Sequence, residues 1–165
     1  MALVFIPATL AMLRQFVADG SLSPVNGTAF AVTPTLREAY SEGDDDELAE
    51  VALQEAALAS LRLLADEAGD LPPRRAVLAA EIEDLKFRPD LDDAVVRLGA
   101  PVSIDDVIAA YVDNADAESA VTKAIEFIDA ADLGDEDAEL IVGDAQDHDL
   151  AWYANQELPF LLDLL

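Results

Sequence analysis

Residues 28–40 read TAFAVTPTLREAY, and this stretch changes from a strand pattern to a helix pattern at one proline. Residues 28–33 form a short apolar run that predicts a strand. Pro34 ends the run, and TLRE (35–38) has the spacing of a capping box that starts a helix. The same order of strand end, proline and Thr-Leu helix start occurs in FIPATLAML, residues 5–13. Both stretches predict strands joined to helices by one kind of turn.

The hydrophobic pattern also predicts strands and helices along the rest of the chain. Strands are expected at 3–6, 28–33, 76–82, 94–98, 107–112 and 150–154. Helices are expected at 10–19, 35–40, 44–68, 113–130 and 135–147, and after Asn155. The fold class is therefore α+β, with a mixed sheet of about 5–6 strands covered by helices, some β-α-β character, and a single domain over 1–165. The longest helix is apolar over a wide arc, which indicates packing on two sides.

The net charge is extreme for a chain with so many apolar residues. Thirty-five acidic residues face nine basic ones, for a net charge of −26, while 53% of the residues are hydrophobic. The high hydrophobic content argues against a disordered acidic chain. A surface this negative repels phosphate backbones and anionic lipids, so we expect no direct nucleic-acid binding and no membrane binding. A basic protein partner, adaptation to a salty cytoplasm and plain solubility remain as explanations.

Several reaction classes lack their sequence signals. The absence of cysteine excludes disulfides, thiolate metal sites and thiol nucleophiles. No glycine-rich nucleotide motif and no GxSxG elbow is present. The N-terminal apolar run has no basic residue before it and contains Pro7, so we expect no signal peptide. These patterns favour a cytoplasmic protein and argue against an enzyme.

The clearest candidate for chemistry is DAQDHD, residues 144–149. Asp144, Asp147, His148 and Asp149 offer carboxylate oxygens and one imidazole nitrogen, a ligand set that suits a divalent metal such as Mg²⁺, Mn²⁺ or Ca²⁺. If residues 144–148 are helical, the first three of these side chains share one face. The same residues also fit a solvated acidic helix end, with His148 near the negative end of the helix dipole.

A second candidate is a small-anion site built from helix starts. If the first, second and fifth expected strands are parallel neighbours, the helix starts that follow them gather at one edge of the sheet. Thr9, Thr35 and Arg37 would then face an anion together. Ordinary helix caps and a surface arginine are the alternative.

The C-terminal segment is the most hydrophobic short stretch, and it lies in an acidic part of the chain. Trp152, Tyr153 and Phe160 are candidates for a partner-binding or homodimer surface, with core packing as the alternative. Residues 124–165 carry twelve acids and no lysine or arginine. A protein partner of this region is therefore expected to be basic.

Four stretches together make the chain similar to a small family of uncharacterised actinobacterial proteins. These are VFIPATL (4–10), GTAFAVTPTLREAY (27–40), RPDLDDAVVRL (88–98) and GDAQDHDLAWYANQELPFLL (143–162). The resemblance covers nearly the whole chain and implies a cytoplasmic actinobacterial protein. It implies no activity and no site residues.

Two functions therefore remain open from the sequence alone. The first is a soluble, non-enzymatic protein-binding or regulatory domain with a strongly acidic surface. The alternative is a divalent-metal-dependent enzyme that uses the DAQDHD cluster, where the metal acts as a Lewis acid or activates water. No cofactor other than that metal is expected.

Overall fold

The structure is a computed structural model that describes residues 2–67 and 69–165. The strands are β1 Ala2–Ala8, β2 Ser21–Leu22, β3 Thr28–Ala31, β4 Ala76–Ile82, β5 Leu85–Phe87, β6 Val95–Leu98, β7 Val102–Ser103, β8 Val107–Val112 and β9 Ala151–Ala154. The α-helices are α1 Leu10–Asp19, α2 Pro34–Ala39, α3 Asp45–Asp66, α4 Glu118–Asp132, α5 Glu136–Gln146 and α6 Leu158–Asp163. Within the described residues, no helix combines the length and the apolar character that crossing a membrane requires.

Seven strands form one sheet in the order β5-β6-β3-β1-β4-β8-β9, and each neighbouring pair is antiparallel. β2 and β7 form a separate two-stranded sheet. The α+β class is confirmed, but the sheet has more strands than expected and is antiparallel rather than mixed. The strands that the sequence pattern missed, β2, β5 and β7, have only two or three residues each. Runs this short show no periodicity.

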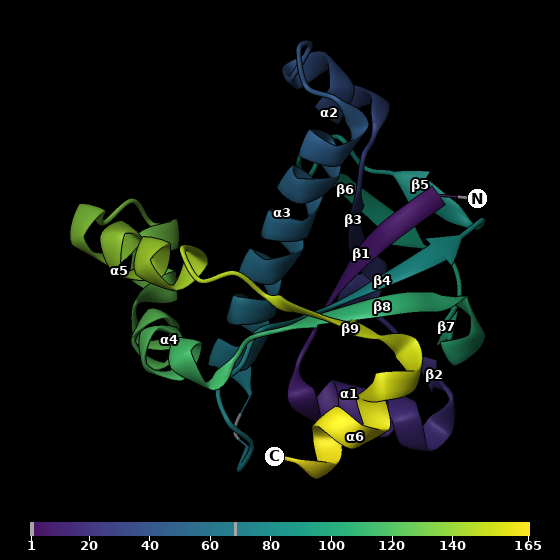
Figure 1. The fold of residues 1–165 in the computed structure, drawn as a ribbon. Coiled ribbons are helices and arrows are strands. Elements are labelled where there is room, and N and C mark those ends of the chain that lie inside the picture. Colours follow the sequence, from purple (N-terminus) through teal and green to yellow (C-terminus); the bar gives the residue numbers. More distant parts are fainter. Residues whose placement is uncertain (1, 68) are drawn as a thin grey trace.

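The centre of the sheet is the β1–β4 pair, which stays in register from Ala2↔Ile82 to Ala8↔Ala76. β4 then pairs with β8, and Ala76 lies opposite Val112. The end of β1, the start of β4 and the end of β8 therefore meet at one edge of the sheet (Figure 1). This edge positions the site described below.

Alternating residues of the strands supply two hydrophobic cores, one on each face of the sheet. Val4 and Ile6 pack with α1 and α6, and the intervening Phe5 packs with α2 and α3. Figure 1 shows α1 and α6 together at one end of the molecule and α3 extending from α2 to the level of α4. Burying a side chain such as Ile6, which is fully buried, contributes roughly 1.5–3 kcal/mol.

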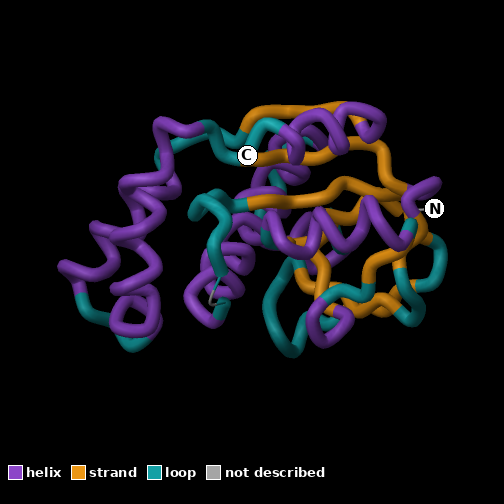
Figure 2. Tube along the Cα trace, turned by 90° about the horizontal axis from the view of Figure 1, so that it is seen from below, coloured by secondary structure: helices purple, strands orange, loops and turns teal. Residues whose placement is uncertain are grey.

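A third core lies away from the sheet, between α3, α4 and α5. Its buried residues include Leu61 of α3, Val121 and Ile128 of α4, and Val142 of α5. α3 thus packs on the sheet along one part and on α4 and α5 along another, as its wide apolar arc predicted. α4 and α5, with the turn between them, form a helical hairpin (residues 118–146) that projects beside the sheet in both views (Figures 1 and 2).

Local sequence signals set the ends of α1. The Thr9 hydroxyl accepts a hydrogen bond from the Met12 amide at 3.2 Å, so Thr9 caps the helix as predicted. Gly20 follows the last helical residue with a φ of 76°, in the left-handed region that favours glycine. Its amide donates to the carbonyl of Phe16 at 2.8 Å.

The predicted capping residue of α2 was wrong by two positions, and the helix starts one residue earlier than expected. Thr33, not Thr35, caps the helix, and its hydroxyl accepts a hydrogen bond from the Leu36 amide at 3.1 Å. Pro34 therefore lies in the first turn, where a helix does not need the amide hydrogen that proline lacks. β3 ends at Ala31 and leaves room for this earlier start.

Candidate interaction site on the helical hairpin

A buried ion pair anchors the hairpin to the sheet. Arg75 precedes β4 and Asp113 follows β8, and their side chains are 1% and 0% exposed. Arg75 donates from Nε to Asp113 Oδ2 and from Nη2 to Asp113 Oδ1, each at 2.8 Å. Asp113 Oδ2 also accepts a hydrogen bond from the backbone amide of Arg75 at 2.8 Å. This paired, charge-assisted geometry is among the strongest that side chains form.

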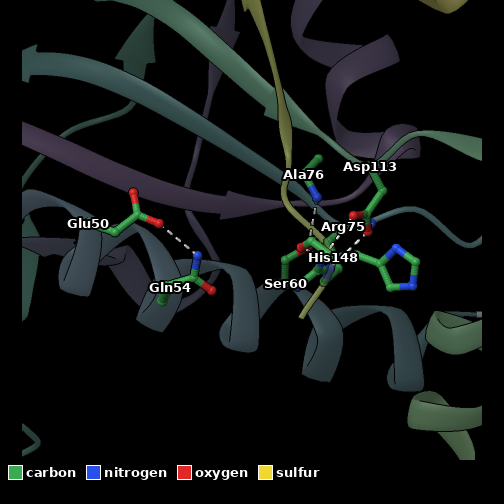
Figure 3. A network of polar contacts seen from close by, with 7 residues as sticks. All are labelled: Glu50, Gln54, Ser60, Arg75, Ala76, Asp113 and His148. Carbon is green, nitrogen blue, oxygen red and sulfur yellow. Dashed lines mark hydrogen bonds and ion pairs between the residues drawn. The ribbon is translucent and has the colours of Figure 1, made fainter. Parts of the chain in front are cut away.

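Two further groups extend this network to α3 and to the segment after α5 (Figure 3). Arg75 Nη2 donates to the backbone carbonyl of His148 at 2.8 Å. The Ser60 hydroxyl of α3 donates to the carbonyl of Ala8 at 2.6 Å and accepts from the Ala76 amide at 3.0 Å. The network therefore joins β1, β4, β8, α3 and the exit from the hairpin at one point.

Two more arginine ion pairs hold the ends of α4. Arg62 of α3 makes two hydrogen bonds to Asp132, the last residue of α4, at 3.0 and 2.9 Å. These bonds hold the pKa of the Asp132 carboxyl below its ordinary value. Arg74 makes an ion pair at 2.9 Å with Glu118, the first residue of α4. Three of the nine basic residues, Arg62, Arg74 and Arg75, therefore attach the hairpin to the rest of the molecule.

A groove of about 600 Å³ runs along the hairpin between α4 and α5. It is lined by Asp116, Ser119, Ala120, Lys123, Glu126, Phe127, Ile141, Asp144 and His148. The lining combines apolar side chains, three carboxylates, one ammonium group and the imidazole. The groove can therefore hold a ligand that has both an apolar part and charged or hydrogen-bonding groups.

Two of the four residues predicted to bind metal line this groove, and two do not. Asp144 and His148 belong to the lining, whereas Asp147 and Asp149 lie outside it and are exposed. Asp147 ends α5, and its amide donates to the carbonyl of Gly143. Among residues 2–67 and 69–165, no three His, Cys, Asp or Glu side chains lie close enough to hold a metal ion. The structure does not bring the DAQDHD residues together as a ligand set.

The residues of the predicted anion site do not converge either. β1 and β3 are antiparallel, so their C-terminal ends point in opposite directions. Thr9 and Thr35, which follow these ends, therefore lie at opposite ends of the strand pair. β8 runs parallel to β1, but β4 separates the two strands. Arg37 makes an exposed ion pair with Asp45 at 2.6 Å. The expected parallel arrangement was wrong, because it assumed that strands followed by similar turns are neighbours with one direction.

The predicted C-terminal partner surface divides between two faces. Trp152 and Tyr153 are consecutive residues of β9, so their side chains point to opposite faces of the sheet. Trp152 is 57% exposed, whereas Tyr153 packs against the core beneath α1 and α6. Phe160, on α6, is 72% exposed. These residues do not form one continuous patch.

Sequence reasoning missed the anchoring residues Arg75, Asp113 and Ser60. The two charged residues could have been found from the sequence, because each directly flanks a strongly apolar strand. The pairing of β4 with β8 brings them together, and that register is not readable from either strand alone. Ser60 lies within the apolar arc of α3 and gave no signal.

The fold and the site together define a class: an antiparallel α+β domain that carries an acidic helical hairpin on an arginine-anchored base. Residues 2–162 match a family described as "Family of unknown function (DUF6912)", and the chain belongs to this family. The match confirms the expected membership in a conserved family without an assigned function. No curated protein and no solved structure gives a significant match.

Proposed function

We propose that this protein is a non-enzymatic binding domain that recruits a basic protein partner through its helical hairpin. One observation carries the proposal. Residues 118–146 contain nine acids and one lysine, while Phe127, Leu133 and Leu140 in the same segment are 39%, 90% and 70% exposed. Exposed apolar side chains within a strongly negative segment are typical of a protein-binding surface.

The way in which the hairpin is attached supports this proposal. Arg62 and Arg74 pair with the carboxylates at the two ends of α4, which leaves the other acids of the hairpin to solvent. Buried Arg75 holds the chain where it leaves α5. A rigidly held surface loses little conformational entropy when a partner binds, which favours affinity.

We further propose that the protein is soluble and resides in the cytoplasm of an actinobacterium. The excess of seven arginines over two lysines fits a high-GC genome. Trp152 and Phe160 are exposed apolar side chains on separate faces, and a homodimer through either of them is the alternative mode of association.

Affinity capture with a charge-reversed hairpin tests the proposal. The variant Asp129→Lys/Asp144→Lys adds positive charge near the C-terminal ends of α4 and α5, where it also favours the helix dipole. We expect the wild-type protein to retain a stoichiometric partner from a lysate of the source cells at about 0.15 M salt and to release it at about 1 M, where screening is nearly complete. The variant is expected to retain much less of that partner.

The matched control is Asp19→Lys/Glu38→Lys, which makes the same change in net charge at the C-terminal ends of α1 and α2. It is expected to retain the partner as the wild type does. Equal loss in both variants would assign the effect to net charge and remove the hairpin from the proposal. The absence of any stoichiometric partner of the wild-type protein would contradict the proposed function itself.

A further inference from the structure

The groove of the hairpin is lined by apolar side chains together with three carboxylates and one lysine. Phe127 of α4 and Ile141 of α5 both line it, and Phe127 remains 39% exposed. Asp116, Glu126 and Asp144 place carboxylates along the same groove. Open apolar surface with a surplus of negative charge favours a ligand that is apolar on one side and positively charged on the other.

The helical segment that lines the groove is long enough to pack against a short helix. Its lining comes entirely from residues 116–127 and 141–148. The part of α4 from Ser119 to Phe127 is about 12 Å long at the rise of an α-helix, so about 8–12 residues of a bound helix fit beside it. The other side of the hairpin packs on α3 through Leu61, Val121 and Val142, so the groove is not closed by that contact.

We propose that this groove binds a basic amphipathic helix of another protein, with the apolar face of that helix between α4 and α5 and its Lys or Arg side chains toward the carboxylates. The proposal rests on the proposed function and names its site and the kind of segment recognised. Insertion of an apolar helix face into a groove is a recurrent mode of peptide recognition. A second copy of this chain is a poor occupant, because it also carries a net charge of −26.

The single lysine of the groove allows a test in which two substitutions should change the affinity in opposite directions. Lys123 is the only basic side chain in the lining apart from the imidazole of His148. It opposes a basic ligand, so its removal should strengthen binding while removal of a neighbouring carboxylate weakens it. Both side chains are exposed, so neither substitution should disturb the fold. A general loss of folding would weaken peptide binding in both variants, whereas the proposal expects changes in affinity of opposite direction.

Binding of a defined peptide to the full chain tests the proposal. The probe is a fluorescently labelled peptide of about 12 residues, with leucines spaced three and four apart and lysines elsewhere. The comparison peptide has the same composition with its leucines distributed around the helix. We expect the amphipathic peptide to bind at least about tenfold more tightly in fluorescence anisotropy titrations, because only it can place an apolar face in the groove.

Variants of the chain locate the binding. Phe127→Ala is expected to weaken peptide binding about tenfold, and Asp144→Asn about twofold to fivefold. Lys123→Ala is expected to strengthen it about twofold to fivefold. The matched control Phe160→Ala removes an exposed aromatic side chain outside the groove and should leave the affinity unchanged.

Three results would overturn the groove as the site. These are equal binding of the two peptides, an unchanged affinity of Phe127→Ala, or an equal loss in Phe160→Ala. Each of them leaves the proposed function standing, because that proposal depends on the capture of a natural partner and not on this peptide. Circular dichroism of each variant checks that the helical content is retained, and Asp144→Asn and Lys123→Ala carry the test if Phe127→Ala fails to fold.

Discussion

At the residue scale, Arg75 and Asp113 are the charged groups with the largest expected effect on stability. Both are buried, and their bonds satisfy each other in a region with little water. A buried charge that loses its partner is far more costly than the pair itself is stabilising. We therefore expect Asp113→Ala to lower the free energy of unfolding by about 3–5 kcal/mol, measured by urea denaturation followed by circular dichroism.

The exposed Arg88–Asp90 pair provides the comparison for this prediction. Its two residues also make two hydrogen bonds, at 2.9 and 2.8 Å. Solvent already screens this pair, so Asp90→Ala should leave the free energy of unfolding nearly unchanged. A similar loss in Asp113→Ala and Asp90→Ala would show that burial does not govern the contribution of the Arg75–Asp113 pair.

Glu55 is a single residue that should make the stability of the protein depend on pH. Burial raises the pKa of this carboxyl above its ordinary value, and the nearby negative charges of Asp92 and Asp93 add to the increase. The folded state thus holds the proton more tightly than the unfolded state. Stability from this group is present below the unfolded pKa and is lost as the pH rises through the folded pKa.

Glu55→Gln removes this titration and keeps the size of the side chain. We expect the variant to have a higher melting temperature than the wild type at about pH 7, and the difference to vanish at about pH 3, well below the ordinary pKa of glutamate, where the wild-type carboxyl is protonated in both states. Thermal melts at several pH values measure the difference. A variant that melts at or below the wild-type temperature at neutral pH would contradict the prediction.

At the element scale, α3 connects the sheet to the hairpin. Leu61 is fully buried in the core that α3 shares with α4 and α5, and Leu140 is a leucine of the same hairpin region that is 70% exposed. We expect Leu61→Ala to lower the free energy of unfolding by about 2–5 kcal/mol, because it leaves a cavity between three helices. Leu140→Ala should change it by less than about 0.5 kcal/mol.

Hydrogen exchange gives this comparison a second measurement. In Leu61→Ala, the amides of α4 and α5 should exchange faster relative to those of β1 and β4, because the hairpin loses packing that the centre of the sheet does not share. Uniform acceleration over all elements would mean that the hairpin does not open separately from the sheet.

At the scale of the whole molecule, the net charge of −26 is the dominant electrostatic feature. Repulsion among surface carboxylates opposes the compact state, and it reaches farther at low salt, where the screening length is about 30 Å at 0.01 M. We expect the melting temperature to rise as NaCl increases from about 0.01 to about 0.5 M while the chain stays folded throughout. Differential scanning calorimetry measures this dependence.

The same salt series separates the explanations of the acidity. A protein adapted to a salty cytoplasm should lose its fold at the lowest salt, whereas a partner-binding protein should remain folded and lose its partner as salt rises. Unfolding at about 0.01 M salt would therefore contradict the prediction and favour salt adaptation. A melting temperature independent of salt would mean that the surface charges are too widely spaced to repel strongly.

Local patterns predicted most elements but not their arrangement. The strands at 76–82 and 107–112 and the helix at 10–19 have the predicted bounds, because apolar periodicity and end signals act within a few residues. The start of α2 was misplaced because both Thr33 and Thr35 can cap a helix, and the early end of β3 selected the first. The direction of neighbouring strands depends on contacts between residues far apart in the chain, so the antiparallel sheet was not predicted.

Patterns along the chain are enough to predict the α+β class, the positions of the long elements, the surplus of negative charge and membership in a conserved family. Which side chains meet depends on how the elements pack. It placed Arg75 against Asp113 through the β4–β8 register, and it put Asp144 and His148 beside Lys123 while leaving Asp147 and Asp149 outside the groove. The physical reason is that secondary structure follows from short-range periodicity, whereas a site requires the long-range packing that brings separate strands and helices into contact.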